Sequence, residues 1–115
     1  MIAFEFPYPP SVNTYYRANG NRRFITKRGM DFRAKVSDQA SELNQEALTH
    51  EIDVFVTLYP PDRRRRDVDN PMKALLDAME HAGIYADDSL IRKLTIERRS
   101  PVKGGKCCVV ILKGE

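Results

Sequence analysis

The stretch that decides the fold runs from Ile52 to Gly83 and contains IDVFVTLYPPDRRRRDVDNPMKALLDAMEHAG. In its first eight residues, aliphatic side chains occupy every second position, which is typical of a strand with one buried face. The apolar side of that strand consists of Ile52, Val54, Val56 and Leu58. Further on, Asn70 suits a helix N-cap, Pro71 a first helical position and Gly83 the position after a helix end. The stretch therefore predicts a strand over 52–59, an arginine-rich loop and a helix over 70–82.

On the N-terminal side, short apolar alternation predicts a strand over 2–6, which the following prolines end. Residues 11–25 are polar and contain Asn19-Gly20-Asn21, so they predict a loop that can include a short strand at 23–25. Thr26 suits an N-cap, and an apolar residue recurs every three or four positions after it, which predicts a helix over 27–47. The members of that helical face are Phe32, Val36, Ala40, Leu43 and Ala47.

On the C-terminal side, residues 90–99 and 106–113 predict two strands that form an antiparallel hairpin, with a turn through Lys103-Gly104-Gly105. The element order is then β-α-β-α-β-β. This order predicts an α+β protein in which one mixed sheet carries two packed helices. At 115 residues, we expect a single domain that spans 1–115.

Composition narrows the possible functions. The net charge is only +3, but residues 36–62 hold six acids and no Lys or Arg, so the positive charge lies in two outer blocks. This distribution points to a polyanionic partner. The longest apolar run, 107–112, is far too short to span a membrane, and the N-terminus has no secretory pattern. Neighbouring Cys107 and Cys108 suit free thiols in a reducing compartment, so we expect a cytoplasmic protein.

The informative acidic pair is Asp67 and Asp69, spaced i, i+2 before the predicted helix, so that extended backbone places both side chains on one side. Two carboxylates held close repel each other unless a cation lies between them, and Mg²⁺ prefers oxygen ligands of this kind. Acids at this place can also interact with the helix dipole as caps. We favour the metal interpretation, because Asn70 already has the residue type of the cap.

The residues alone leave the roles of two neighbouring features open. Asp87-Asp88 can be a polar turn, or it can join the first acidic pair if a neighbouring strand or a dimer brings it back along the helix. Lys73, in the first helical turn, can form a surface pair with Asp77 or contact a phosphate in the transition state.

Cationic and aromatic side chains form the rest of the candidate interface. Arg63, Arg64, Arg65 and Arg66 repel one another, so they need solvent or an anion. Around residues 15–28, tyrosines alternate with bases, which suits stacking and phosphate contact as well as packing over a sheet edge. The candidate residues for contact with a nucleic acid outside the arginine run are Tyr15, Tyr16, Arg17, Lys103 and Lys106.

Taken together, these residues resemble the RusA family of Holliday-junction resolvases. The resemblance is carried by Asp62–Asn70, Lys73 and the Asp87-Asp88 pair at the family's mutual spacings. Pro9-Pro10-Ser11 and Lys103-Gly104-Gly105 resemble two less specific motifs of the family, and the likeness covers essentially the full chain.

The resemblance implies a homodimeric, Mg²⁺-dependent endonuclease that resolves four-way DNA junctions by paired symmetric cleavage, in DNA recombination and repair. It implies that Asp67, Asp69 and Asp88 are the catalytic metal ligands and Lys73 the catalytic lysine, in a bacterial or phage-encoded protein. Two other functions also fit the residues: a less selective Mg²⁺-dependent nuclease on duplex or flap DNA, and a non-catalytic DNA-binding module.

Overall fold

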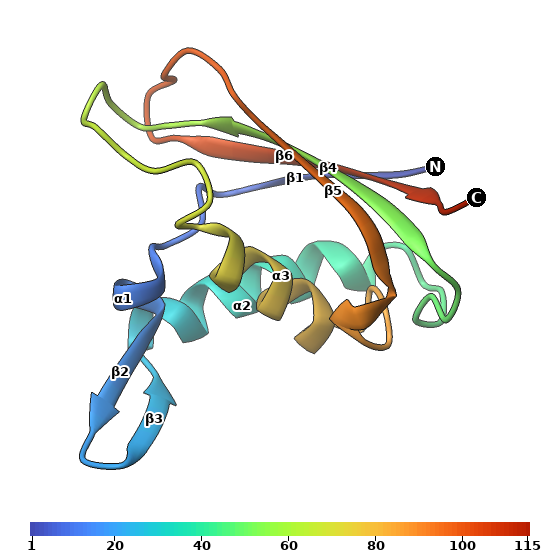
Figure 1. Cartoon of the computed structure of the whole chain (residues 1–115), viewed down its shortest axis with the longest axis horizontal. Coiled ribbons are helices and arrows are strands. Elements are labelled where there is room, and N and C mark those ends of the chain that lie inside the picture. The colour runs from blue at the N-terminus through green and yellow to red at the C-terminus, as the bar shows by residue number, and fades with distance from the viewer.

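The computed structural model describes all 115 residues and places the strands predicted over 2–6, 52–59, 90–99 and 106–113 in one mixed sheet. The strands lie in the order β1 (Ile2–Phe6), β6 (Lys106–Lys113), β4 (Ile52–Tyr59) and β5 (Ile91–Arg98). β6 pairs antiparallel with both β1 and β4, whereas β5 runs parallel to β4 (Figure 1). The strand predicted over 52–59 is confirmed and lies in the interior of the sheet.

The predicted hairpin between the last two strands is wrong, because β4 lies between β5 and β6. The connection over residues 99–105 crosses the end of β4, where the N–H of Arg99 donates to the carbonyl of Leu58. The turn at Lys103–Gly105 is present, and Gly104 and Gly105 adopt φ of 81° and 70°. Both strands pair with β4, so the alternation predicted the elements correctly but not their neighbours.

Two longer helices, α2 (Lys27–Ser41) and α3 (Met72–His81), cover one face of this sheet (Figure 1). Thr26 is the N-cap of α2 as predicted, and its hydroxyl accepts from the N–H of Gly29 at 3.0 Å. The helix ends at Ser41 rather than at 47. Asn44 beyond it has a φ of 49°, which leaves the α-helical region, and Leu43 is exposed rather than packed.

Residues 11–25 form an arm rather than a loop. The arm consists of the short helix α1 (Val12–Tyr15) and a hairpin of β2 (Tyr16–Asn19) and β3 (Arg22–Ile25), with Gly20 at a φ of 65° in the turn. Figure 1 shows this hairpin extending away from the four-stranded sheet, beside the start of α2. The short strand predicted at 23–25 is confirmed as part of β3. The elements α1 and β2 were not predicted, because β2 is mostly exposed and polar and has no apolar alternation.

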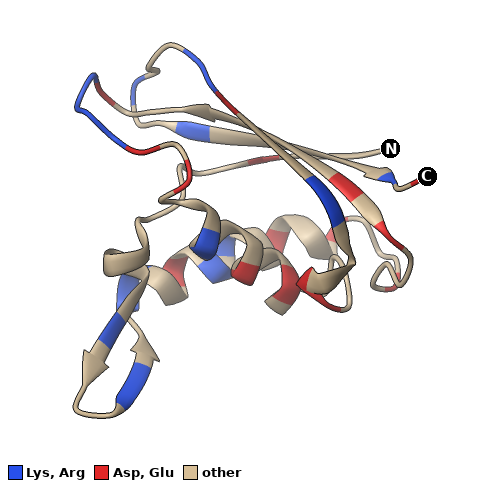
Figure 2. Cartoon of the chain, viewed as in Figure 1, with Lys and Arg blue, Asp and Glu red and all other residues tan.

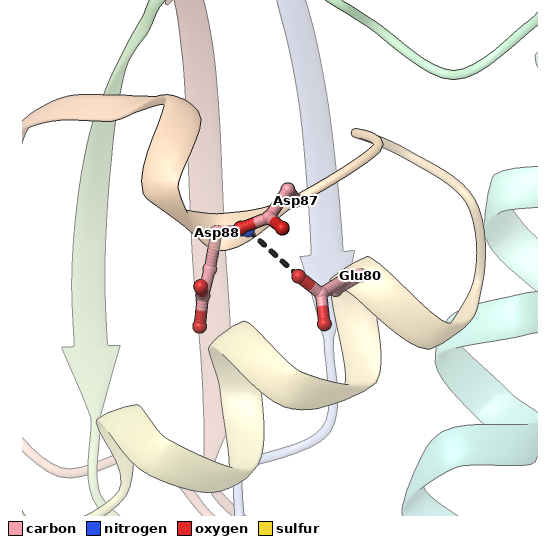
Figure 3. Close-up of side chains that lie close together, drawn as sticks. All are labelled: Glu80, Asp87 and Asp88. Atoms are coloured by element: carbon pink, nitrogen blue, oxygen red, sulfur yellow. Dashed lines mark hydrogen bonds between the residues drawn. The ribbon is translucent and has the colours of Figure 1, made fainter.

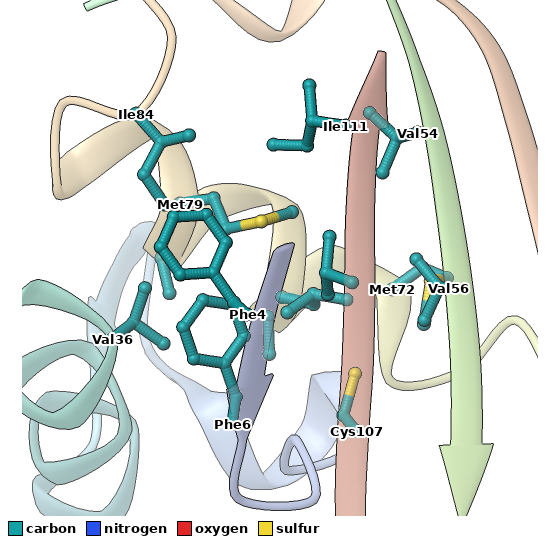
Figure 4. Packing of buried hydrophobic residues seen from close by; sticks show 14 of the residues in the cluster. Phe4, Phe6, Val36, Val54, Val56, Met72, Met79, Ile84, Cys107 and Ile111 are labelled. Carbon is teal, nitrogen blue, oxygen red and sulfur yellow. The ribbon is translucent and has the colours of Figure 1, made fainter. Parts of the chain in front are cut away.

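One cluster of 19 buried residues fills the space between the sheet and the helices (Figure 4). The inward side of β4 packs there against α3, and the rings of Phe4 and Phe6 stack with centroids 5.0 Å apart. Cys107 and Cys108 are free, and burial raises the pKa of the Cys107 thiol to about 12. None of the helices has the length and apolar character needed to cross a membrane. Because residues of β4 and α3 share the core, α3 is packed against the sheet, and its two ends lie at opposite ends of β4.

Candidate active site

Asp67 and Asp69 lie in the loop between β4 and α3, and both are exposed. Their main-chain carbonyls accept from the N–H groups of Asn70 and Met72, so the backbone here is already turning toward the helix. Neither carboxylate has a hydrogen-bonding or ion-pairing partner within the chain, and α3 has no side-chain cap. Two carboxylates without partners are thus held close in sequence beside a helix N-terminus, where a cation or a donor can reach them.

Asn70 is not the N-cap of α3, which corrects the prediction; Pro71 occupies that position. The side chain of Asn70 instead accepts from the N–H of Val12, the first residue of α1, at 3.0 Å. Asn70 therefore fastens the arm to the acidic loop. The metal interpretation was favoured partly because Asn70 was expected to cap α3, and that argument no longer holds. Asp67 and Asp69 do not cap the helix either, because α3 has no side-chain cap.

Lys73 is exposed on the first turn of α3 and forms no salt bridge. The surface pair with Asp77 that the spacing allowed is not formed, because Asp77 accepts from Arg33 at 2.7 Å and from the hydroxyl of Tyr15. The ammonium group of Lys73 is thus available to an anion beside Asp69.

A second acidic group lies beyond the other end of α3, where Asp87 precedes the short 3₁₀ helix η1 (Asp88–Leu90). Carboxylate oxygens of Glu80, Asp87 and Asp88 all lie within 4.8 Å of one another (Figure 3). Glu80 accepts from the N–H of Asp88 at 2.7 Å, and Asp87 accepts from the N–H of Ser89, which lowers the pKa of Asp87. This cluster could hold a divalent cation. Sequence analysis missed Glu80, whose position in the last turn of a helix carries no motif.

The structure does not bring Asp67 and Asp69 together with Asp88 in one chain. The ten residues of α3 separate them, a rise of about 15 Å along the helix axis. Because β5 runs parallel to β4, the loop with Asp88 precedes β5 at the opposite end of the sheet from Asp67. One protomer therefore presents two acidic groups at the two ends of α3.

The arginine run forms an exposed loop beside Asp67, with one exception. Arg66 is half-buried, donates to Asp62 at 2.7 Å and lies over the ring of Tyr8. Donation from Arg66, then from the N–H of Arg64, lowers the pKa of Asp62 to about 2. Figure 2 shows Lys and Arg gathered on this loop and on the β2–β3 arm, at the same side of the molecule. The loop therefore presents a local positive surface next to the acidic pair.

The aromatic candidates divide into two groups. Tyr15 is fully buried, which does not support the predicted DNA contact, since its ring packs in the core. Tyr16 is half-buried, and the guanidinium of Arg23 lies 4.0 Å from its ring centroid. Arg17 and Lys103 are exposed, whereas Lys106 lies 3.3 Å from Glu5 and over the ring of Tyr59. Arg17 and Lys103 are thus the members of this set that remain fully available to a partner.

An α+β fold that carries one pair of aspartates without internal partners, beside a free lysine and an arginine loop, is typical of a protein of the nuclease class. The model of the family "Endodeoxyribonuclease RusA" matches residues 7–111, and the chain belongs to this RusA family.

Relatives are similar over nearly the whole length. The chain is 36% identical over 113 residues to "Crossover junction endodeoxyribonuclease rusA" of Enterobacteria phage HK97, which covers 97% of this chain and 94% of the relative. It is 35% identical over 105 residues to "Crossover junction endodeoxyribonuclease RusA" of Shigella sonnei (strain Ss046) and 34% identical to that of Escherichia coli (strain K12), each with 90% of this chain and 88% of the relative covered.

Proposed function

We propose that this protein is a structure-selective endodeoxyribonuclease that resolves four-way DNA junctions by paired phosphodiester cleavage, in DNA recombination and repair. The observation that carries the proposal is local. Asp67 and Asp69, without partners, lie beside an unpaired Lys73 and a basic loop. The full-length similarity to crossover junction endodeoxyribonucleases of phage and bacteria supports the same activity.

We propose Mg²⁺ as the metal, held by Asp67, Asp69 and Asp88. The donor set fits this ion, since it consists of exposed carboxylate oxygens, and neither Asp67 nor Asp69 is engaged by a protein cation. When bound, the metal would neutralise charge on the phosphate and make attacking water more acidic. Lys73 would donate to a phosphate oxygen as negative charge develops there.

The separation of the two acidic groups supports a homodimer. Two cuts across a junction need two active sites, and a two-fold axis supplies them. We propose that this axis sets α3 of one protomer antiparallel to α3 of its partner. Asp67 and Asp69 of one protomer would then face Asp88 of the other, which the length of α3 prevents within one chain.

Other parts of the chain have simpler proposed roles. The exposed Arg63, Arg64 and Arg65 would position the DNA backbone without reading its sequence. We also propose that residues 1–115 form one endonuclease domain, which the single core and the matched range 7–111 support. Phage and bacterial relatives and two free cysteines support a bacterial cytoplasm as the place of action.

The test compares cleavage of a synthetic four-way junction and a linear duplex, with and without Mg²⁺, by the wild type, Asp67→Asn and Asp38→Asn. We expect the wild type to cut only the junction, and only with Mg²⁺. Asp67→Asn should bind the junction without cutting it, whereas Asp38→Asn, an exposed acid on α2, should behave as the wild type.

Three outcomes would contradict parts of the proposal. Equal cutting of junction and duplex would indicate the less selective nuclease. Binding without cutting under any condition would indicate the non-catalytic module. Undiminished cutting by Asp67→Asn would remove that residue from the site.

A further inference from the structure

A polar hollow of about 540 Å³ lies beside Asp67, where three segments distant in sequence meet. The segments are the Pro9-Pro10-Ser11 stretch, the start of α2 with Arg28, and the arginine loop. The N–H of Val12, which follows the first segment, donates to the side chain of Asn70, which follows the third. The hydroxyl of Thr26 at the start of α2 donates to the carbonyl of Thr14, so all three walls are held together.

The charge in this hollow is not balanced from within the chain. Four arginines line it, Arg28 and Arg64–Arg66, and Asp67 is the only acidic residue among its walls. Asp62 neutralises Arg66 and lies 3.8 Å from Arg64, but Arg28 and Arg65 form no ion pair. Uncompensated guanidinium groups around a concave polar surface are typical of sites that bind phosphate.

Neutral donors complete the lining. The amide oxygen of Asn70 is used by Val12, so the orientation of this side chain leaves its NH₂ group as a free donor. Ser11 and Thr14 also line the hollow, and because one of their hydroxyls donates to the other at 2.9 Å, one hydroxyl proton of the pair remains to donate. A phosphate here would meet both charged and neutral donors, as phosphate contacts on DNA commonly do.

We propose that this hollow is a subsite for one backbone phosphate of the DNA strand, next to the phosphate that is cut, and that Arg28 is its distinguishing cation. The inference rests on the proposed function. It adds to the interface a residue of α2, which lies 39 positions before Asp67 in the chain. A phosphate seated here would fix the strand relative to Asp67, so that the next phosphate along the strand reaches the acidic pair.

The chain offers a matched control in Lys27. It has the same charge and adjoins Arg28 in the first turn of α2, but it does not line the hollow and lies 3.7 Å from Asp31. Helix-dipole effects of removing a positive charge are similar at the two positions. Any difference in junction affinity between Arg28→Gln and Lys27→Gln therefore measures the contribution of the hollow to binding.

The experiment measures the dissociation constant for a four-way junction without divalent metal, as a function of NaCl concentration. We expect Arg28→Gln to weaken binding about tenfold, the loss of one charge-assisted contact, and to reduce the slope of log affinity against log salt by about 0.9. Lys27→Gln should change affinity less than twofold. Equal effects of the two substitutions would overturn the subsite, even where the wild type cuts junctions normally.

A second measurement replaces single phosphates near the cleaved bond by uncharged methylphosphonates. At one position the wild type should lose at least about tenfold in affinity, whereas Arg28→Gln should lose clearly less there, because the contact of Arg28 is already absent and only the other donors of the hollow are affected. A similar further loss by Arg28→Gln at every position would overturn the assignment. Failure of the wild type to bind or cut junctions at all would instead reject the proposed function.

Discussion

Arg33 donates to the Asp77 carboxylate at 2.7 Å, and this bond joins α2 to α3 next to Tyr15 of the arm. The same oxygen of Asp77 accepts from the hydroxyl of Tyr15, which in turn accepts from Arg33 at 2.8 Å. The ion pair is largely shielded, with 19% and 23% of the two side chains exposed. Three elements thus meet at one closed polar network, and Asp77 is kept from pairing with Lys73.

We predict that Arg33→Met lowers the free energy of unfolding by about 2 kcal/mol, because it leaves Asp77 and Tyr15 without their shared donor in a shielded place. Urea unfolding followed by circular dichroism measures this loss. Lys27→Met is the control, since the pair of Lys27 with Asp31 is solvent-exposed and should contribute at most about 0.5 kcal/mol. Equal midpoints for the two variants would show that the network does not stabilise the fold.

The same network predicts a pH dependence. Burial raises the pKa of Asp77, but hydrogen bonds from Tyr15 and Arg33 outweigh it and hold that pKa below its ordinary value. A carboxyl with a lowered pKa in the folded state stabilises the protein at pH above about 4 and loses this contribution as the pH falls further. The stability difference between wild type and Asp77→Asn should therefore shrink from pH 6 to pH 3. A constant difference would contradict the lowered pKa.

Elements that depend on neighbouring residues follow from the sequence, whereas the contacts between distant elements do not. β4 and α3 were predicted nearly to their ends, because alternation and the Pro71 and Gly83 positions are properties of neighbouring residues. The pairing of β5 with β4 was not predicted. The pattern of β5 and β6 is the same whether the two strands lie next to each other or on either side of a third strand, as they do here around β4. Strand order follows from the shared core rather than from either strand alone.

The candidate site shows the same division. Asp67 and Asp69 stand out by their spacing before a helix, and the structure leaves both of them and Lys73 exposed and without partners. Their roles in metal binding and catalysis stay predictions. Asn70 suited a cap by residue type, yet its partner Val12 lies 58 positions away and is visible only in the fold. Glu80 lies near the Asp87-Asp88 pair because the chain turns back after α3, where Gly83 adopts a φ of 78° and the hydroxyl of Tyr85 donates to the carbonyl of Leu76 at 2.7 Å.

Lys73 provides a kinetic prediction. Lys73→Met should lower the single-turnover rate of junction cleavage about 100-fold, the usual cost of one lost donor to developing negative charge, with junction affinity changed less than threefold. Lys113→Met, an exposed lysine at the end of β6, should leave both quantities as in the wild type. A loss of affinity in proportion to the loss of rate would make Lys73 a binding residue instead.

Mixed dimers test whether the two acidic groups act across the interface. In a dimer of one Asp67→Asn and one Asp88→Asn protomer, a site shared between protomers leaves one site with both substitutions and the other intact, so one strand of the junction is nicked. Sites contained within single protomers would each carry one substitution, and neither strand would be cut. A dimer of Asp67→Asn with Asp69→Asn is the control, since it should be inactive under both arrangements. Separately tagged, co-expressed protomers and denaturing gels supply the measurement.

Gly29 gives a prediction in which packing opposes helix propensity. A Cβ on Gly29 would lie 2.7 Å from Cγ2 of Ile25 and 2.8 Å from the carbonyl oxygen of Tyr15, and the latter is backbone that cannot move aside. Gly29→Ala should therefore destabilise the protein by about 1–3 kcal/mol, although alanine favours a helix over glycine by about 1 kcal/mol. Ala34→Gly, at an exposed position of the same helix, should lose about 1 kcal/mol from propensity alone. If Gly29→Ala unfolded at higher urea than the wild type, the close approach of α2 to the arm would be wrong.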